Sequence, residues 1–269
     1  MTKVEYELMT IGEIVEAKRH APLVFVPVSP IEWHGPHLPV GTDGLHAHHV
    51  AVRLAREVGG VVLPTLFAGT ETVLQSKPDS NELGVLGLDE DARVVGMDFP
   101  GFPVKSLYFE ESAFGIAVRD LVRALAADSF RVIVLVNGHG ATNHIRTLER
   151  IAREEARRDE VTVMSLMVWV PPPPPNRDPG HAAREETAVM MAIAEEHVHL
   201  DQLPPPDVPL RYAEYGIVDG PAFDGFPTSD FTVAADADPR SATREEGKRI
   251  LEREVQVAAA RVRQELERW

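Results

Sequence analysis

Residues 32–49, with the sequence EWHGPHLPVGTDGLHAHH, contain five histidines, one glutamate and one aspartate. Imidazole nitrogens and carboxylate oxygens bind zinc, manganese and iron in proteins. Glu32 and His34 are two residues apart, so in extended backbone their side chains point to the same side and can bind one or two ions. Asp43 stands at the end of the loop, where its two oxygens can bridge two ions. The stretch therefore predicts a metal centre, although a polar Gly/Pro loop before an ordinary helix could contain the same residues.

Two later segments carry side chains of the same kind. His139 lies in VNGHG, directly after an apolar run, and His181 and Glu186 lie in GHAAREET. The glycines on either side of His139 allow other backbone to approach closely. Because Asn-Gly is also common in simple turns, NGHG alone is weak evidence for a site. The three segments form one metal centre only if the fold brings them together.

Apolar runs that alternate with helical patterns predict a single α/β domain over residues 1–269, with a mainly parallel sheet flanked by helices. The expected strands cover residues 23–28, 61–66, 131–136 and 161–168. The expected helices cover about residues 44–57, 112–126, 142–157, 184–195 and 242–268. Ligands of open parallel sheets bind at the carboxyl ends of the strands. Because the polar segments follow strands, we expect them to converge on one site at that edge.

The composition limits the classes of partner and ligand. The chain has 269 residues, of which 44% are hydrophobic, and a formal net charge of −15. This charge argues against nucleic acid and anionic membranes as partners, because both would be repelled. There is no cysteine, so a bound metal must use His, Asp and Glu. No signal-like N-terminus or membrane-length apolar run is present, and we expect a cytoplasmic protein that acts on a small molecule.

Three blocks of sequence carry a family resemblance. Residues 26–43, VPVSPIEWHGPHLPVGTD, closely resemble the signature P-x-G-S-x-E-x-H-G-P-H-L-P-L-x-T-D of the creatininase (creatinine amidohydrolase) family. Residues 128–143 resemble that family's strand ending in N-G-H-G-G-N, and residues 180–188 resemble its block G-H-A-G-x-x-E-T-S. FPG at residues 99–101 resembles a family F-P-G-T element. The blocks keep the family's order.

The resemblance implies a compact α/β metal-dependent hydrolase, usually a homo-oligomer, that acts on C–N bonds of small cyclic or amide substrates. Carried over by motif position, the metal ligands are Glu32, His34, Asp43 and His139. The expected cofactor is one or two divalent ions per subunit, zinc or manganese, with iron as a further candidate. Creatininase proper has a carboxylate two residues after the histidine of its N-G-H block, where this chain has Ala141. This departure, together with a longer region before FPG, argues against creatinine itself as the substrate.

Three residues have expected roles beside those four ligands. Glu186 holds the family's E-T-S glutamate position and can replace the carboxylate missing at Ala141, if the segment after the prolines 171–175 carries its helix over the site. The alternative is a solvent-facing glutamate in a first helical turn. His181 is the candidate for passing a proton to the leaving group. Trp169, at a strand end, is the candidate wall of the substrate pocket, although tryptophans more often serve packing.

Other polar residues are expected to be structural. His46, His48 and His49 lie in the helix after Asp43, which could itself cap that helix. His37 is expected beside the ligands rather than among them. Residues 110 and 111 are expected to begin a helix. Residues 79–90 imitate a calcium loop but place Leu83 where an oxygen is required.

These features predict hydrolysis of an amide or cyclic amide bond in a small polar molecule, with water activated by the ion. One alternative is ring-opening C–C hydrolysis of a cyclic ketone in polyol (inositol-type) catabolism. Another is a metal- or ligand-binding protein without turnover. No G-x-S-x-G elbow and no phosphate loop is present, which argues against esterase and nucleotide-dependent activities. The long connection over residues 68–111 is expected to cover the pocket or to contribute to a subunit contact.

Overall fold

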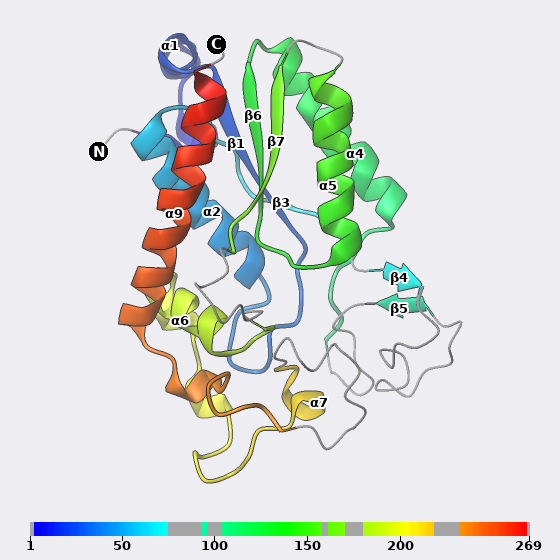
Figure 1. The fold of residues 1–269 in the computed structure, drawn as a ribbon, viewed down its shortest axis with the longest axis vertical. Coiled ribbons are helices and arrows are strands. Elements are labelled where there is room, and N and C mark those ends of the chain that lie inside the picture. Colours follow the sequence, from blue (N-terminus) through cyan, green and yellow to red (C-terminus); the bar gives the residue numbers. More distant parts are fainter. Residues whose placement is uncertain are drawn as a thin grey trace.

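A parallel sheet forms the centre of the molecule in the computed structural model, which describes residues 3–70, 72–74, 93–95, 104–157, 161–169, 180–217 and 232–267 (Figure 1). Its strands are β1 (Leu23–Ser29), β2 (Val61–Val62), β3 (Leu66–Phe67), β6 (Val132–Asn137) and β7 (Thr162–Met167). The order is β2-β1-β6-β7, and β3 pairs with the later part of β1. All residues of β1 and β6 are buried, as expected of continuous apolar runs covered on both faces.

Helices cover both faces of this sheet (Figure 1). On one face lie α2 (Thr42–Val58), α6 (Arg184–Ile193) and α9 (Arg244–Leu266), and on the other lie α4 (Glu111–Ala127) and α5 (Thr142–Ala156). Successive strand residues alternate between the two cores. Phe25 and Val134 pack toward α2 and α9, while Val26 and Leu135 pack toward α4 and α5. The fold is therefore an α/β domain with a mainly parallel sheet, as the sequence predicted.

Smaller elements surround this domain. The helix α1 (Ile11–His20) begins with a capping box formed by Thr10 and Glu13. An antiparallel pair, β4 (Thr72–Leu74) and β5 (Arg93–Val95), belongs to the long connection. The remaining short helices are η1 (Tyr6–Leu8), η2 (Glu195–His197), η3 (Leu200–Gln202), α7 (Tyr212–Tyr215) and η4 (Pro239–Ser241).

The prediction of one strand over residues 61–66 was wrong. The segment forms β2 and β3, and Pro64 lies between them without an N–H group for the sheet. Val62 pairs with Phe25, and Leu66 pairs with Val28. The segment from β2 to β3 therefore advances four residues where β1 advances three. The expected helix over 184–195 ends at Ile193 and is followed by η2.

Several expectations fall outside the described residues: the calcium-like loop at 79–90, the FPG element at 99–101 and the prolines at 171–175. Within the residues that the structure describes, no helix has both the length and the apolar character needed to cross a membrane.

Candidate metal centre

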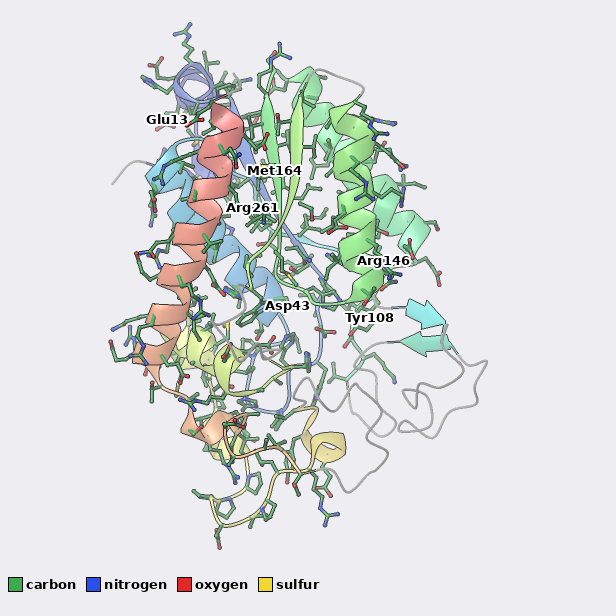
Figure 2. All side chains as sticks on the ribbon, in the orientation of Figure 1. Glu13, Asp43, Tyr108, Arg146, Met164 and Arg261 are labelled. Carbon is green, nitrogen blue, oxygen red and sulfur yellow. The ribbon has the colours of Figure 1, made fainter. Side chains whose placement is uncertain are left out.

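The three polar segments meet beyond the carboxyl ends of β1 and β6. Glu32 and His34 follow β1, His139 follows β6, and Glu186 lies in the first turn of α6. Asp43 lies in the first turn of α2, at the same end of the sheet as Tyr108 (Figure 2). The five predicted ligands are all buried, with at most 5% of any of them exposed.

Asp43 occupies the middle of this cluster. Its Oδ1 atom lies 3.1 Å from His34 Nε2, and its Oδ2 atom lies 3.1 Å from His139 Nδ1. Glu186 Oε2 lies 3.7 Å from His34 Nε2, and Glu32 Oε2 lies 3.3 Å from His139 Nδ1. Two groups of three residues have ligand atoms within 4.8 Å of one another. One is Glu32, Asp43 and His139, and the other is His34, Asp43 and Glu186. Asp43 belongs to both groups, with one carboxylate oxygen beside each histidine.

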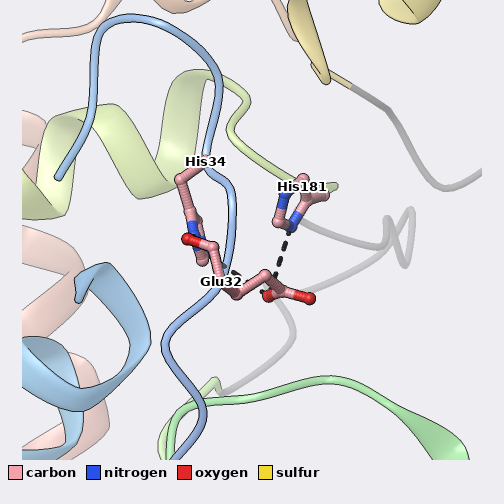
Figure 3. A group of neighbouring side chains, drawn as sticks. All are labelled: Glu32, His34 and His181. Atoms are coloured by element: carbon pink, nitrogen blue, oxygen red, sulfur yellow. Dashed lines mark hydrogen bonds and ion pairs between the residues drawn. The ribbon is translucent and has the colours of Figure 1, made fainter. Parts of the chain in front are cut away.

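A third group consists of Glu32, His34 and His181, which come from the loop after β1 and the segment before α6 (Figure 3). His181 Nδ1 lies 3.8 Å from Glu32 Oε2, and the rings of His181 and His34 are 4.4 Å apart between centroids. His181 Nε2 lies 2.6 Å from the carbonyl oxygen of Trp33. Because Nε2 carries the hydrogen donated to that carbonyl, the lone pair of Nδ1 faces the cluster.

Local backbone contacts fix the ligand side chains. His34 Nδ1 donates to the carbonyl oxygen of Glu32 at 3.1 Å, so Nε2 faces Asp43 and Glu186. Asn137 holds the loop of His139 from both sides, since it accepts from His139 N at 2.8 Å and donates to His139 O at 2.9 Å. A Cβ atom on Gly138 would lie 2.2 Å from the carbonyl oxygen of Asp43. Glycine is therefore required where the loop of His139 crosses the start of α2.

Glu186 is positioned by the turn before α6. Its Oε2 atom accepts a hydrogen bond from the backbone N–H of Ala182 at 2.6 Å. Ala182 adopts a positive φ of 51°, which is uncommon for a residue with a Cβ atom. This turn directs the carboxylate toward His34 rather than toward solvent, so the alternative of a solvent-facing glutamate was wrong.

The buried carboxylates of the cluster give it a negative charge that a cation would balance. Burial lowers the pKa of His34, but Asp43, Glu186 and Glu32 together raise it to about 10. Burial, aided by Asp43 and Glu32, raises the pKa of Glu186 to about 8 despite His34. Burial also opposes ionisation of Asp43, yet His34 and His139 bring its pKa below the usual range. Without an ion, protonated His34 is a cation and protonated Glu186 is neutral, and both reduce the negative charge of the buried cluster.

The donor set fits one or two divalent ions on these observations. It offers imidazole nitrogens and carboxylate oxygens in two overlapping groups, with no thiolate in the chain. A divalent ion would replace the protons on His34 and Glu186, as expected where ligands must lose protons to bind. The cluster is therefore a candidate divalent-metal centre.

His37 and His181 are both neutral near pH 7. Burial, together with His34 and His181, lowers the pKa of His37 to about 3, and its Nε2 atom bonds Thr187 Oγ1 at 2.9 Å. It thus supports the neighbour of Glu186, in line with its expected place beside the ligands. Burial and His34 lower the pKa of His181 to about 4, although Glu32 and Asp43 oppose the shift.

Two other expectations concern α2. Asp43 is not its N-cap: the cap position is Gly41, which makes no side-chain hydrogen bond, and the Asp43 carboxylate is directed at His34 and His139. His46 is buried in the core as expected, where its Nε2 atom lies 2.7 Å from Glu254 Oε2. The carboxylate of Asp43 is thus left for the metal centre.

Trp169 contacts the loop that carries His139. Its indole Nε1 donates to the carbonyl oxygen of Gly138 at 3.1 Å, and its ring meets His46 edge-on at 4.6 Å between centroids. These contacts support the loop of His139, and the role of Trp169 as a pocket wall stays a prediction. Glu111 begins α4, as expected for the acidic pair at 110 and 111, and accepts from Thr147 at 3.0 Å.

Tyr108 is a residue of the site that no motif identified. Its hydroxyl donates to Glu32 Oε1, and its ring centroid lies 6.2 Å from that of His139. It belongs to the last residues of the long connection, which returns to pair with Ile31 through Leu107. No spacing in the sequence marks this contact, because Tyr108 lies 76 positions after Glu32.

Comparison with known proteins shows which family the chain resembles over most of its length. The family model "Creatininase: Creatinine amidohydrolase" matches residues 7–262. The chain is 27% identical to the creatinine amidohydrolase of Pseudomonas putida, over 90% of this chain and 89% of that protein. It is 28% identical to the mycofactocin precursor peptide peptidase of Mycolicibacterium smegmatis (strain ATCC 700084 / mc(2)155), over 92% of this chain and 85% of that protein.

Solved structures show the same fold. A crystal structure of creatinine amidohydrolase (creatininase) aligns with a TM-score of 0.67 at 24% identity and covers 99% of both chains. A mutant creatininase described as "Zn-Zn type" has the same values, and the structure described as "Creatininase Mn" aligns with a TM-score of 0.65 at 22% identity, covering 98% of this chain and 99% of that chain.

Proposed function

The chain belongs to the creatininase family, and we propose that it is a metal-dependent hydrolase of an amide or cyclic amide bond in a small polar molecule. The observation that carries the proposal is the position of Asp43, which lies 3.1 Å from an imidazole nitrogen on each side. One relative is named as an amidohydrolase and the other as a peptidase, and both names describe cleavage of amide bonds.

The proposed cofactor is zinc or manganese, with iron as a further candidate. Glu32, Asp43 and His139 would hold one ion, and His34, Asp43 and Glu186 would hold a second. When bound, such ions lower the pKa of a water molecule toward neutrality and polarise a carbonyl group. The similar folds described as "Zn-Zn type" and "Creatininase Mn" support this choice of metals.

The proposed role of His181 is to move a proton to the leaving nitrogen. Its Nε2–H is occupied by the carbonyl of Trp33, so Nδ1 is the atom that would accept and return a proton beside Glu32. A pKa of about 4 makes protonated His181 a ready donor, because the buried ring readily gives up a proton that it has gained. His34, whose Nδ1 is bonded to Glu32 O, remains a ligand.

The substrate is proposed to differ from creatinine. Ala141 offers no oxygen where creatininase proper has a carboxylate, and Glu186 supplies the carboxylate beside His34 instead. The proposal is tested by metal analysis of the purified chain, followed by a hydrolysis screen of the fully loaded protein against creatinine, lactams, small amides and short peptides. Turnover of a cyclic ketone but of no amide would favour ring-opening C–C hydrolysis, and no turnover at all would favour a binding protein.

We also propose that the chain forms a homo-oligomer and acts in the cytoplasm. Leu107 and Phe109, on either side of Tyr108, are 60% and 44% exposed. Contiguous exposed apolar side chains are typical of contact surfaces. Light scattering at micromolar concentration tests the assembly, and a strictly monomeric mass would reject it.

A further inference from the structure

We propose that Tyr108 is a positioning residue of the metal centre, which holds one oxygen of Glu32 so that the other faces the ions. The two oxygens of this buried carboxylate have different surroundings. Oε1 accepts the hydrogen bond from the Tyr108 hydroxyl. Oε2 lies 3.3 Å from His139 Nδ1, 3.8 Å from His181 Nδ1 and 3.9 Å from His34 Nε2.

The orientation of Glu32 matters because this residue belongs to two of the three candidate ligand groups. A glutamate has three side-chain torsions, and a carboxylate without a partner on its outer oxygen can rotate away from the ions. A hydroxyl that bonds Oε1 removes this freedom. Hydrogen bonds from outside the ligand shell commonly fix ligating carboxylates in this way.

Tyr108 is itself fixed relative to Glu32. Leu107 N donates to Ile31 O at 2.8 Å, and Phe109 N donates to Gly69 O at 2.8 Å. Trp33 N donates to Ser106 Oγ at 2.9 Å. The residues on both sides of Glu32 are therefore tied to the segment that carries Tyr108. This arrangement distinguishes the contact from a chance encounter of surface side chains.

The hydrogen bond from Tyr108 to Glu32 joins the end of the long connection to the candidate metal ligands. If Tyr108 favours the arrangement of Glu32 that binds the ion, then bound metal must equally favour the arrangement of Tyr108, because coupling between two sites is reciprocal. Metal should therefore slow hydrogen exchange at the backbone N–H groups of Leu107 and Phe109. A tyrosine that only fills space would show no such coupling.

The deciding variant is Tyr108→Phe, which keeps the ring beside His139 and removes only the hydroxyl. We expect zinc or manganese to bind about 10- to 100-fold more weakly, the usual effect of losing an outer partner of a ligand. Affinity is measured by competition with a chelator, so no substrate is needed. Tyr6→Phe is the matched control, because Tyr6 packs against the apolar core on the α4 and α5 side and belongs to no candidate ligand group, so metal affinity should stay unchanged.

The outcomes separate this inference from the proposed function on which it rests. Wild-type affinity in Tyr108→Phe, with unchanged circular dichroism, would overturn the positioning role. Lower turnover at unchanged metal affinity would also overturn it and would make Tyr108 a substrate contact. Metal binding without amide hydrolysis by the wild-type chain would refute the proposed function alone. Absence of metal binding by the wild-type chain would overturn both. Exchange at Leu107 and Phe109 gives a second test that does not depend on the variant.

Discussion

The carboxylate of Asp43 divides its two oxygens between two histidines: Oδ1 lies 3.1 Å from His34 Nε2, and Oδ2 lies 3.1 Å from His139 Nδ1. Such an arrangement uses both oxygens of one side chain. It leaves none of the carboxylate for the cap of α2, whose first turn contains Asp43. The two candidate ion positions are therefore linked through this one residue, and its substitution should affect both.

Asp43→Asn should abolish binding of metal at concentrations that saturate the wild-type chain, with complete loss of hydrolysis and a folded protein. The amide retains the shape of the side chain but removes the charge and one acceptor oxygen. Metal content by atomic spectroscopy, together with circular dichroism, measures the effect. Asp120→Asn, at an exposed position of α4, serves as the control and should retain full metal content. Unchanged metal content in Asp43→Asn would contradict the bridging role.

Glu186→Gln should weaken binding of the ion shared with His34 by more than about 100-fold, beyond the usual loss for a partner outside the ligand shell. Glutamine keeps an oxygen that can accept from Ala182 N, so the start of α6 should be preserved. Glu185→Gln is the control, because adjacent helical residues point about 100° apart. Isothermal titration gives the number of ions per chain. Two ions in Glu186→Gln, or equal losses in both variants, would exclude the proposed role.

Metal affinity should rise as the pH increases from about 6 to about 8. In the metal-free protein the pKa is about 10 for His34 and about 8 for Glu186, so both carry protons in this range and an ion must displace them. Calorimetry in buffers of different ionisation enthalpy should detect release of about two protons at pH 7 when both ion positions fill. An affinity that does not change with pH would contradict this assignment.

The same shifts predict the opposite trend for the stability of the metal-free protein. The pKa of His34 is raised from 6.5 to about 10, so the folded state binds this proton more tightly than the unfolded chain does. The stabilisation is complete below pH 6.5 and is lost as the pH rises toward 10. Thermal unfolding with a chelator present should show that the stability of the metal-free protein falls over this pH range. With metal bound, stability should instead rise with pH.

The strands and the main site segments could be predicted because local pattern determines them. β1 and β6 are uninterrupted apolar runs, and the residues that follow parallel strands must emerge at one edge of the sheet. Glu32, His34 and His139 could therefore be placed together without coordinates. Pro64 divides β2 from β3 through a missing N–H group, an effect that the hydrophobic pattern of residues 61–66 conceals.

The contact of Tyr108 could not be predicted, because it depends on a pairing between Leu107 and Ile31 that no periodicity encodes. The start of α2 was misplaced for a different reason. Aspartate is a strong N-cap residue, so local preference places Asp43 just before the helix. In the structure the helix begins at Thr42, and the carboxylate instead serves His34 and His139.

Glu254→Gln should lower the free energy of unfolding by about 1–3 kcal/mol, because the buried His46 loses the carboxylate that bonds its Nε2 atom. The pair joins α2 to α9 outside the ligand cluster, so metal affinity should remain unchanged. Urea denaturation of the metal-free protein measures the loss. Glu252→Gln, on the exposed side of the same helix where it pairs with Arg53, should cost less than about 1 kcal/mol. Equal effects of the two variants would contradict a stabilising role of the buried pair.

His181→Asn should lower kcat by about 100- to 10,000-fold, the usual contribution of a positioned proton donor or acceptor, while metal affinity stays close to that of the wild-type chain. The imidazole lies beside Glu32 with Nε2 fixed by Trp33 O, so Nδ1 is the atom that the variant removes from proton transfer.

Measurements with the substrate found by the hydrolysis screen should also show that the variant loses a titration from the pH profile of kcat. His197→Asn, at an exposed position, should change neither quantity. A large loss of metal affinity in His181→Asn would instead assign this histidine to the group of Glu32 and His34 as a ligand, and full activity would place the proton on another side chain.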